Sequence, residues 1–290
     1  MFIVSMQQLL WTPIADRIKT ELTQQVRDLS LEHHYVAIIY CGDNPASATY
    51  VRMKQKFAQD IGLDLKIFGQ DGQIQTPTDL LKISSELASD PLCIGYMPQL
   101  PLPIDLKSAQ FELFDRIPRE KDIDGLGSHF IGKYITNQID ILWATPQAVM
   151  TLLDEYGYGD LKGKKVSIVW QSNLIGKPLL LACIRRGATV YSFNSKSDRD
   201  DMRYSCLHSD IIISCTGVVH LLDETFFRDD HTQVAIDVGR GFLDGKAVGD
   251  MTLDTIASKV LAYTPIPWWV WPLTIASLLH NAIYLYTINR

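Results

Sequence analysis

The sequence predicts an α/β protein of two domains. Three observations support this fold class: apolar strand-like runs alternate with helical periodicity, the alternation occurs in two separate blocks, and 290 residues are enough for two domains. Strands joined by helices form parallel sheets with right-handed crossovers. We therefore expect two parallel sheets, each covered by helices.

The first block of alternation ends near Gln99. Its expected elements are helix 14–29, strand 35–40, helix 45–61, strand 63–68, helix 78–88 and strand 92–99. Asn44 followed by Pro45 indicates where the second helix begins, because asparagine caps helices and proline is favoured at their first position. Ligands of parallel sheets gather at the carboxyl ends of strands, so we expect a site just after these strands.

The second block predicts a Rossmann-like nucleotide domain. Its expected elements are helix 146–156, strand 165–169, helix 175–186, strands 189–193, 211–214 and 234–238, and a final helix 274–288. Residues 268–286 nearly reach the roughly 20 apolar residues of a membrane span. However, Pro272, His280 and Asn281 interrupt the stretch, so we interpret it as a loop followed by a buried helix.

Composition limits the classes of partner. The chain is 21% charged and 47% hydrophobic, as in ordinary soluble globular proteins, and its net charge of −6 comes without a basic run. We therefore expect no nucleic acid and no membrane partner. The five cysteines form no CxxC pair, which favours reduced core thiols in a cytoplasmic protein. No zinc-type ligand spacing is present, so no metal is expected. The N-terminus lacks the basic region and long apolar stretch of a signal peptide.

Segment 50–54 (YVRMK) contains a candidate acid/base pair. Ser47, Tyr50 and Lys54 lie at i, i+3 and i+7, so they share one helix face. A phenol and an amine on one face can exchange protons if burial lowers the pKa of the lysine.

Two further segments present polar side chains beside residues that restrict the backbone. In segment 99–103 (QLPLP), Gln99 offers an amide donor and acceptor, followed by two prolines. In segment 121–125 (KDIDG), Asp122 and Asp124 lie in a glycine-containing loop, where a carboxylate can reach a ligand.

Together these segments closely resemble the bifunctional methylenetetrahydrofolate dehydrogenase/methenyltetrahydrofolate cyclohydrolase family, nearly end to end. The segments that follow in the order of that family are 145–150, 172–178, 210–217, 236–239, 244–250 and 264–274. The resemblance implies a folate-binding catalytic domain at 1–144, a Rossmann-like NADP-binding domain at 145–273, and a C-terminal helix, 274–290, that returns to the first domain. It also implies a cytoplasmic homodimer acting on tetrahydrofolate derivatives.

The resemblance also implies roles for individual residues. Lys54 would be the central catalytic residue of both activities, with Tyr50 beside it and Gln99 orienting it. Asp124 would bind the pterin ring, and Pro272 and Thr274 would contact the substrate. We interpret Asp122 as a loop-capping aspartate. The implied chemistry is hydride transfer from 5,10-methylenetetrahydrofolate to NADP, then hydrolysis of the methenyl product to 10-formyltetrahydrofolate.

The cofactor loop of the family corresponds here to residues 170–178 (WQSNLIGKP). Trp170, Gln171 and Ser172 would lie in the cofactor loop, and Arg240 would abut the cofactor. Ser172 and Ser195 are candidate phosphate donors, and each could equally be an ordinary turn serine. After the next strand, Ser195 stands in a Ser/Lys cluster with no acid to bind a ribose 2′-hydroxyl, which favours NADP over NAD.

Tryptophan replaces glycine at family glycine positions. Five of the six tryptophans stand at such positions, namely Trp11, Trp170, Trp268, Trp269 and Trp271, and Trp143 stands where the family usually has proline. One hypothesis is a gene in which UGA encodes glycine, here translated as tryptophan. The alternative is true divergence, which would leave a folate-binding homologue or a cyclohydrolase without a working nucleotide site.

Overall fold

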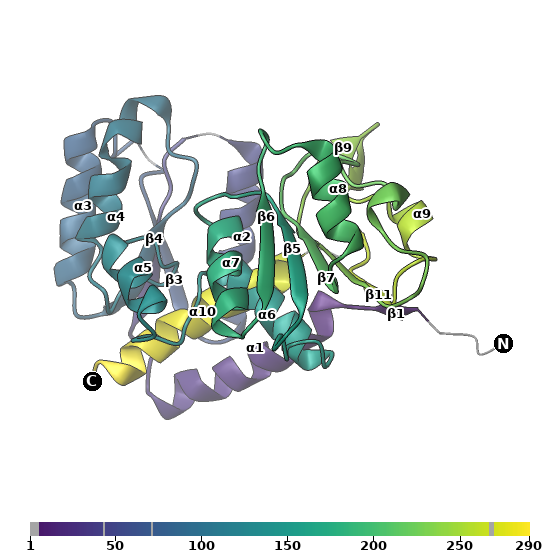
Figure 1. The fold of residues 1–290 in the computed structure, drawn as a ribbon. Coiled ribbons are helices and arrows are strands. Elements are labelled where there is room, and N and C mark those ends of the chain that lie inside the picture. Colours follow the sequence, from purple (N-terminus) through teal and green to yellow (C-terminus); the bar gives the residue numbers. More distant parts are fainter. Residues whose placement is uncertain (1–5, 43, 71, 267–269) are drawn as a thin grey trace. The chain divides into compact units, whose positions relative to one another are not determined.

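The computed structural model describes residues 6–42, 44–70, 72–266 and 270–290 (Figure 1). The chain forms two compact units. One comprises residues 15–144 and 274–290, and the other comprises the chain up to residue 14 together with residues 145–273. The α/β class and the return of the last helix to the first block are as expected.

The unit of residues 15–144 is built on a three-stranded parallel sheet of order β3-β2-β4. The strands are β2 (Tyr35–Ile39), β3 (Asp64–Phe68) and β4 (Cys93–Pro98), and the main helices are α1 (Trp11–Asp28), α2 (Pro45–Asp60) and α3 (Pro77–Ser89). All five residues of β2 are buried, which explains its continuous apolar run. The order reverses at β2, so the loops after β2 and β4 open at the position where such sheets bind ligands.

Shorter helices and the last helix complete this unit. They are η1 (Ile104–Ala109), α4 (Gln110–Arg116), α5 (Ser128–Ile135) and α10 (Trp271–Ile288). The buried amide of Asn281, on α10, donates to the carbonyl oxygens of Ile123 (3.1 Å) and Leu142 (2.9 Å). These bonds tie α10 to the loop that carries Asp122 and Asp124. No described helix is long and apolar enough to cross a membrane.

The second unit contains a six-stranded parallel sheet of order β1-β11-β8-β7-β5-β6. Its strands are β1 (Gln7–Gln8), β5 (Lys165–Val169), β6 (Thr189–Phe193), β7 (Ile211–Ser214), β8 (Val234–Asp237) and β11 (Ala262–Tyr263). The order reverses at β5, the first long strand, so the turn after β5 occupies the switch point of the sheet. The N-terminal β1 pairs with β11, so the structure groups the chain up to residue 14 with the second unit. The family resemblance had implied a first domain of residues 1–144.

Helices and one hairpin surround this sheet. They are α6 (Ala144–Glu155), α7 (Gly176–Arg185), α8 (Arg199–Leu207), η2 (Glu224–Phe226), α9 (Leu253–Ile256), and the antiparallel pair β9 (Gly241–Leu243) and β10 (Lys246–Val248). The five cysteines are all free and buried, as expected for core thiols.

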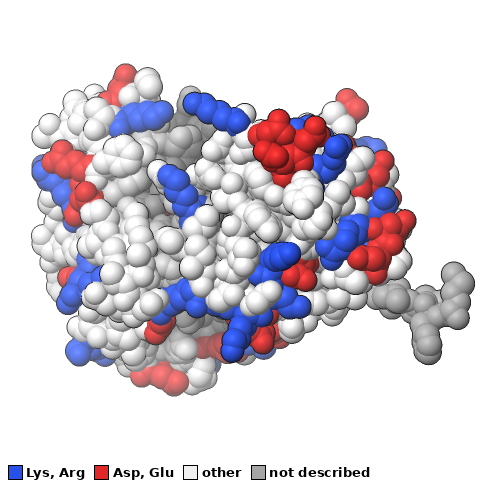
Figure 2. All heavy atoms as spheres, in the orientation of Figure 1, with Lys and Arg blue, Asp and Glu red and all other residues white. Residues whose placement is uncertain are grey.

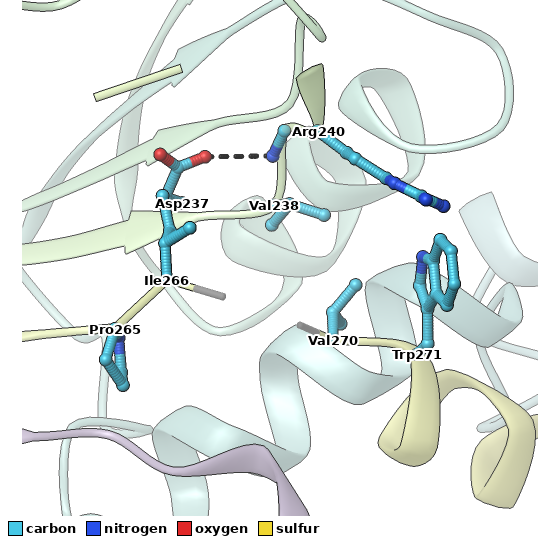
Figure 3. Close-up of a pocket in the computed structure, with 8 residues that line it drawn as sticks. Asp237, Val238, Arg240, Pro265, Ile266, Val270 and Trp271 are labelled. Carbon is cyan, nitrogen blue, oxygen red and sulfur yellow. Dashed lines mark hydrogen bonds between the residues drawn. The ribbon is translucent and has the colours of Figure 1, made fainter. Parts of the chain in front are cut away.

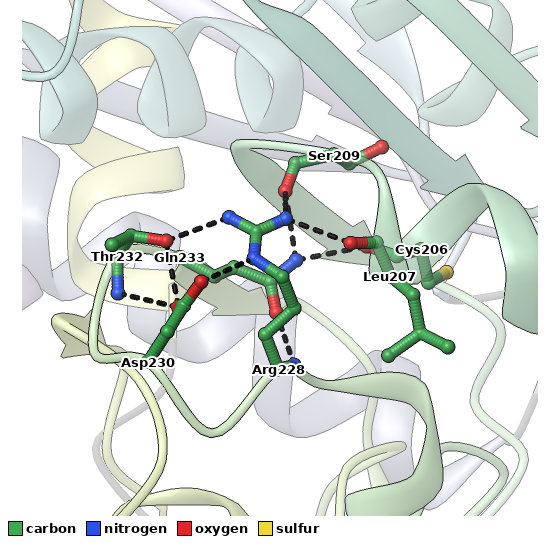
Figure 4. A network of polar contacts seen from close by, with 7 residues as sticks. All are labelled: Cys206, Leu207, Ser209, Arg228, Asp230, Thr232 and Gln233. Atoms are coloured by element: carbon green, nitrogen blue, oxygen red, sulfur yellow. Dashed lines mark hydrogen bonds and ion pairs between the residues drawn. The ribbon is translucent and has the colours of Figure 1, made fainter.

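A guanidinium group closes the end of α8 (Figure 4). Arg228 Nη1 donates to the carbonyl oxygens of Leu207 (2.8 Å) and Ser209 (2.9 Å), and its Nε lies 2.7 Å from Asp230 Oδ2. The last carbonyls of a helix have no partner within the helix, so a cation there meets both their hydrogen-bonding capacity and the helix dipole. Arg228 therefore serves the fold.

Candidate active site

Lys54 is a buried amine on α2. Only 3% of its surface is exposed, and Nζ donates to Gln99 Oε1 at 3.0 Å and to Met97 Sδ at 3.5 Å. Nζ also lies 5.1 Å from the centre of the Tyr50 ring, one helical turn earlier. Burial lowers the pKa of Lys54 to about 8, although the negative charge of Asp124 opposes the shift. The amine can therefore exist in both protonation states near neutral pH.

The start of α2 sets the direction of this face. Asn44 Oδ1 accepts a hydrogen bond from the Ser47 backbone N–H at 3.1 Å, and Pro45 is the first helical residue. This is the N-cap that the Asn-Pro dipeptide predicts. With the helix beginning there, Tyr50 and Lys54 lie one turn apart on the side facing β4.

Gln99 is fixed at the carboxyl end of β4. Its backbone N–H donates to the Ile39 carbonyl at 2.8 Å, and its side-chain Nε2 donates to the Leu100 carbonyl at 2.9 Å. Because Nε2 is committed to that carbonyl, Oε1 faces Lys54 as an acceptor. The structure therefore brings Tyr50, Lys54 and Gln99 together.

The two aspartates of segment 121–125 differ in their surroundings. Asp122 is fully buried and accepts hydrogen bonds from the backbone N–H groups of Leu126 and Gly127, both at 2.9 Å. This geometry gives Asp122 a role in holding the loop. Burial raises the pKa of Asp124 to about 6, and the charge of Lys54 acts against that rise. Asp124 thus interacts electrostatically with the buried amine.

Thr274 lies near the beginning of α10, two residues after Pro272. It is 5% exposed, and its Oγ1 is buried with no hydrogen-bond partner among the described residues. A buried hydroxyl without a hydrogen bond destabilises a protein by on the order of 1–3 kcal/mol. Such atoms in native proteins commonly bind a ligand or a water molecule. Thr274 belongs to the same compact unit as Lys54.

The turn after β5 is tight and places Trp170 in a backbone conformation that favours glycine. Trp170 has φ of +111°, a region that residues with a Cβ rarely adopt. Ser172 Oγ accepts hydrogen bonds from the N–H groups of Ile175 and Gly176, both at 3.2 Å, so this serine pairs with backbone donors at the start of α7, whose N-cap residue is Ile175. The predicted strand–turn–helix arrangement is present, and its first residue is strained.

Gln171 and the turn after β6 are linked by side-chain amides. Gln171 Nε2 donates to the Ser192 carbonyl at 3.0 Å, and its Oε1 accepts from Asn194 Nδ2 at 2.8 Å. Ser195 is exposed in the turn that follows. The next acid in the sequence is Asp198, which accepts hydrogen bonds from the N–H groups of residues 200 and 201 as the N-cap of α8. No carboxylate within the turn 194–197 is thus available to a ribose.

Arg240 and Trp271 lie against each other (Figure 3). The guanidinium carbon of Arg240 is 4.0 Å from the centre of the Trp271 ring and 5.0 Å from that of Phe242. The recess beside them has a volume of about 10 Å³ and is lined by segments 237–240, 265–266 and 270–271. Such a volume holds about one water molecule.

The remaining tryptophans differ from one another. Trp11 is 1% exposed, and its Nε1 is buried with no hydrogen-bond partner among the described residues. Trp143 is also buried, but its ring makes edge contacts with Phe130 at 5.2 Å and Tyr134 at 5.6 Å. Trp268 and Trp269 lie outside the described residues. Of these rings, Trp143 has well-defined packing partners.

Sequence reasoning missed the buried pair formed by Asp250 and Asp237, the last residue of β8. Asp237 accepts from the N–H groups of Gly239 (2.9 Å) and Met251 (2.8 Å). Asp250 Oδ2 accepts from Ser214 Oγ at 2.7 Å, and Gly239 packs so closely on Asp250 that a Cβ would collide with it. Burial, reinforced by the nearby Asp250, raises the pKa of Asp237 to about 7. The sequence signal was an acid close to a glycine in both segments: Asp237 stands two residues before Gly239, and Asp250 directly follows Gly249.

The fold and the buried lysine define a class: an α/β protein of two units, one built on a Rossmann-like sheet and the other on a smaller parallel sheet that carries an amine site. Residues 9–124 match the tetrahydrofolate dehydrogenase/cyclohydrolase catalytic domain, and residues 143–290 match the NAD(P)-binding domain of the same family. The chain belongs to the tetrahydrofolate dehydrogenase/cyclohydrolase family.

Curated relatives and solved structures agree with this membership. Bifunctional protein FolD 2 from Lactobacillus johnsonii is 34% identical over 93% of this chain and 94% of its own length. The bifunctional enzyme FolD from Campylobacter jejuni matches with a TM-score of 0.92 and 31% identity, covering 99% of this chain and all of that one. The Trypanosoma brucei enzyme, described as complexed with NADP cofactor and inhibitor, has a TM-score of 0.87 at 25% identity, covering 98% of each chain.

Proposed function

We propose that the protein is a bifunctional enzyme of one-carbon folate metabolism. It would oxidise 5,10-methylenetetrahydrofolate to 5,10-methenyltetrahydrofolate with NADP, and hydrolyse that product to 10-formyltetrahydrofolate. The observation that carries the proposal is the buried Lys54, hydrogen-bonded to Gln99 and next to Tyr50, in a chain that belongs to this family. A cytoplasmic location and a homodimeric assembly remain predictions.

The hydrolytic step uses the neutral form of Lys54. The amine accepts a proton from water as the oxygen attacks the methenyl carbon, and the protonated amine returns a proton to the folate nitrogen as the ring opens. A pKa of about 8 lets Lys54 serve in both directions near neutrality. Gln99 holds Nζ in place through Oε1, and Asp124 stabilises the protonated amine. Asp124 would also bind the pterin ring through its carboxylate.

Two features of the second unit support a nicotinamide cofactor with a 2′-phosphate. The β5–α7 turn lies at the switch point of the sheet, and the turn 194–197 offers Ser195, Lys196 and Ser197 with no free acid. When bound, NADP would supply the hydride acceptor. Gln171 would contribute its amide beside this turn.

The tryptophans do not fit that cofactor. Trp170 carries a bulky side chain at φ +111° where backbone must approach phosphate, and the recess between Arg240 and Trp271 holds about one water rather than a nicotinamide ring. These observations favour a second candidate function for the polypeptide with tryptophan as written: cyclohydrolase activity alone, which requires no nucleotide. A folate-binding homologue with neither activity is the third possibility.

One assay separates these functions. Methenyltetrahydrofolate absorbance is followed in two directions: its loss by hydrolysis without NADP, and its formation from methylenetetrahydrofolate with NADP. Both signals support the bifunctional enzyme, and hydrolysis alone supports the cyclohydrolase. If neither signal appears and the protein still binds folate, the result supports the folate-binding homologue without activity. The intact mass of the protein from its native host then shows whether glycine replaces tryptophan at the five family glycine positions.

A further inference from the structure

A cavity of about 140 Å³ lies in the same compact unit as Lys54 but is lined by none of the residues assigned to the folate site. Its wall comes from the loop before α5, from α5 itself and the turn after it, and from the end of α10. The lining residues are Arg119, His129, Phe130, Lys133, Gln138, Ile139, Leu285, Ile288 and Asn289. A cavity of this size accommodates a molecule as large as benzene.

One part of the wall is apolar and another is cationic. Phe130 and Leu285 are buried and present hydrocarbon, while Arg119 and Lys133 bring two positive charges to the cavity. Neither cation has an ion-pair partner within the part of the chain that the structure describes. Such a wall suits a ligand with an apolar body and a negative group.

His129 adds an unmet hydrogen-bonding atom. Its Nε2 is buried without a partner among the described residues, and burial lowers the pKa of the imidazole, so the ring is neutral at pH 7. Asp115 and Glu120 act against that shift and Arg119 and Lys133 act with it. The two acids do not line the cavity, and Asp115 Oδ1 already accepts from the Ser128 N–H at 2.9 Å. The cavity wall itself is therefore positive.

The neutral amides at the rim are already partly committed. Gln138 Nε2 donates to Thr136 Oγ1 at 3.0 Å, and Asn289 Nδ2 donates to the Leu285 carbonyl at 2.7 Å. They fix the rim and leave the cations as the groups able to turn toward a ligand. We propose that this cavity is a second ligand site, which takes a small aromatic carboxylate with its ring against Phe130 and Leu285 and its carboxylate at Arg119 and Lys133.

The test uses benzoate as the probe and benzamide as its neutral analogue of the same shape. We expect benzoate to bind the full chain with a Kd in the millimolar range, consistent with a ligand of so few atoms, and benzamide to bind at least about five-fold more weakly. In protein labelled with ¹⁵N-histidine, benzoate should shift the His129 ring signals. Equal binding of the two compounds, or a shift confined to other histidines, would overturn the proposal.

Two variants localise the binding. Arg119→Gln with Lys133→Gln should weaken benzoate binding at least about five-fold, since both charges that attract the carboxylate are lost. Arg17→Gln with Lys82→Gln removes the same charge from α1 and α3 of the same unit and should change nothing. Ile288→Trp, which fills the cavity from an exposed position without altering charge, should also abolish binding. Unchanged affinity in both cavity variants contradicts the site.

Discussion

The carbonyl oxygen of Trp170 occupies the space that a Cβ on Gly176 would need. The turn between β5 and α7 therefore closes on itself with no room for a side chain at its far end. The same closure holds Trp170 at φ +111°, where a Cβ is strained. At the end of the turn, Gly176 is the residue that this close approach requires. At its start, Trp170 has a large side chain where the backbone conformation favours glycine.

Trp170→Gly should stabilise the protein. Residues held in sparsely populated backbone regions cost of order 1–3 kcal/mol, and Trp170 is only partly buried, so little packing is lost. We expect the midpoint of urea unfolding to rise by an amount equivalent to about 1 kcal/mol.

Trp143→Gly is the matched control, because the same substitution is made at a buried ring with ordinary backbone. The loss of the contacts with Phe130 and Tyr134 should cost about 3–5 kcal/mol. If both variants lose stability to a similar degree, the strain at Trp170 is not real.

The pH dependence of hydrolysis should follow Lys54. Burial lowers the pKa of this amine to about 8, so the neutral form required to accept a proton is scarce below pH 8. We expect the rate of hydrolysis to rise about tenfold per pH unit below 8 and to level off above it. Asp124→Asn removes a charge that raises the pKa of Lys54, so the same variant should shift the rise to lower pH. An unmoved profile would mean that another group titrates.

Lys54→Met should abolish both activities and also change stability with pH. The pKa of Lys54 is lowered in the folded state from 10.5 to about 8, so between these values the unfolded chain binds the proton and the folded chain does not. Stability of the wild type should therefore gain about 3 kcal/mol from this group as pH rises through that window, and none below it. The methionine variant should lack this gain in urea unfolding measured at pH 8 and pH 10. Hydrolysis at a near wild-type rate would remove Lys54 from the mechanism.

Much of the fold was predictable because strand-like apolar runs alternate with segments of helical periodicity, and most of the longer strands are buried. The strands 165–169, 189–193 and 211–214 were predicted with the bounds that the structure shows. The edge strand β1 and its neighbour β11 have two residues each, too short for any pattern to appear. The helix α8 was missed because its polar sequence owes its stability to the Asp198 cap and to Arg228, which is distant in sequence.

The site was predictable to the extent that it depends on local spacing. Tyr50 and Lys54 share a helix face through their i, i+4 separation, and the sequence alone shows this. That Gln99 Oε1 rather than Nε2 faces Lys54 depends on the Leu100 carbonyl, which only the folded loop positions.

The mixed character of the surface also agrees with the composition: over the face in Figure 2, basic and acidic side chains are interspersed rather than gathered into a basic patch.

Changing Trp170, Trp268, Trp269 and Trp271 to glycine, in protein made by a host with the standard code, should create or strengthen NADP-dependent dehydrogenase activity. The reason is steric. At position 170 the backbone must approach the dinucleotide phosphate, and at positions 268, 269 and 271 each indole side chain adds on the order of 200 Å² of surface. Removing the Trp271 ring also frees the Arg240 guanidinium, now 4.0 Å from it, and enlarges the recess of about 10 Å³.

Trp170→Gly alone is the control that separates the two loops. If the Trp271 ring still excludes the nicotinamide ring, this variant should bind NADP but should not catalyse the dehydrogenase reaction. Binding is measured by calorimetry with NADP, and turnover by methenyltetrahydrofolate absorbance. If the unaltered protein already binds NADP tightly and turns over, the steric argument fails. If the four-glycine variant is inactive as well, recoding loses its functional support, and divergence to a protein without dehydrogenase activity becomes the better account of these tryptophans.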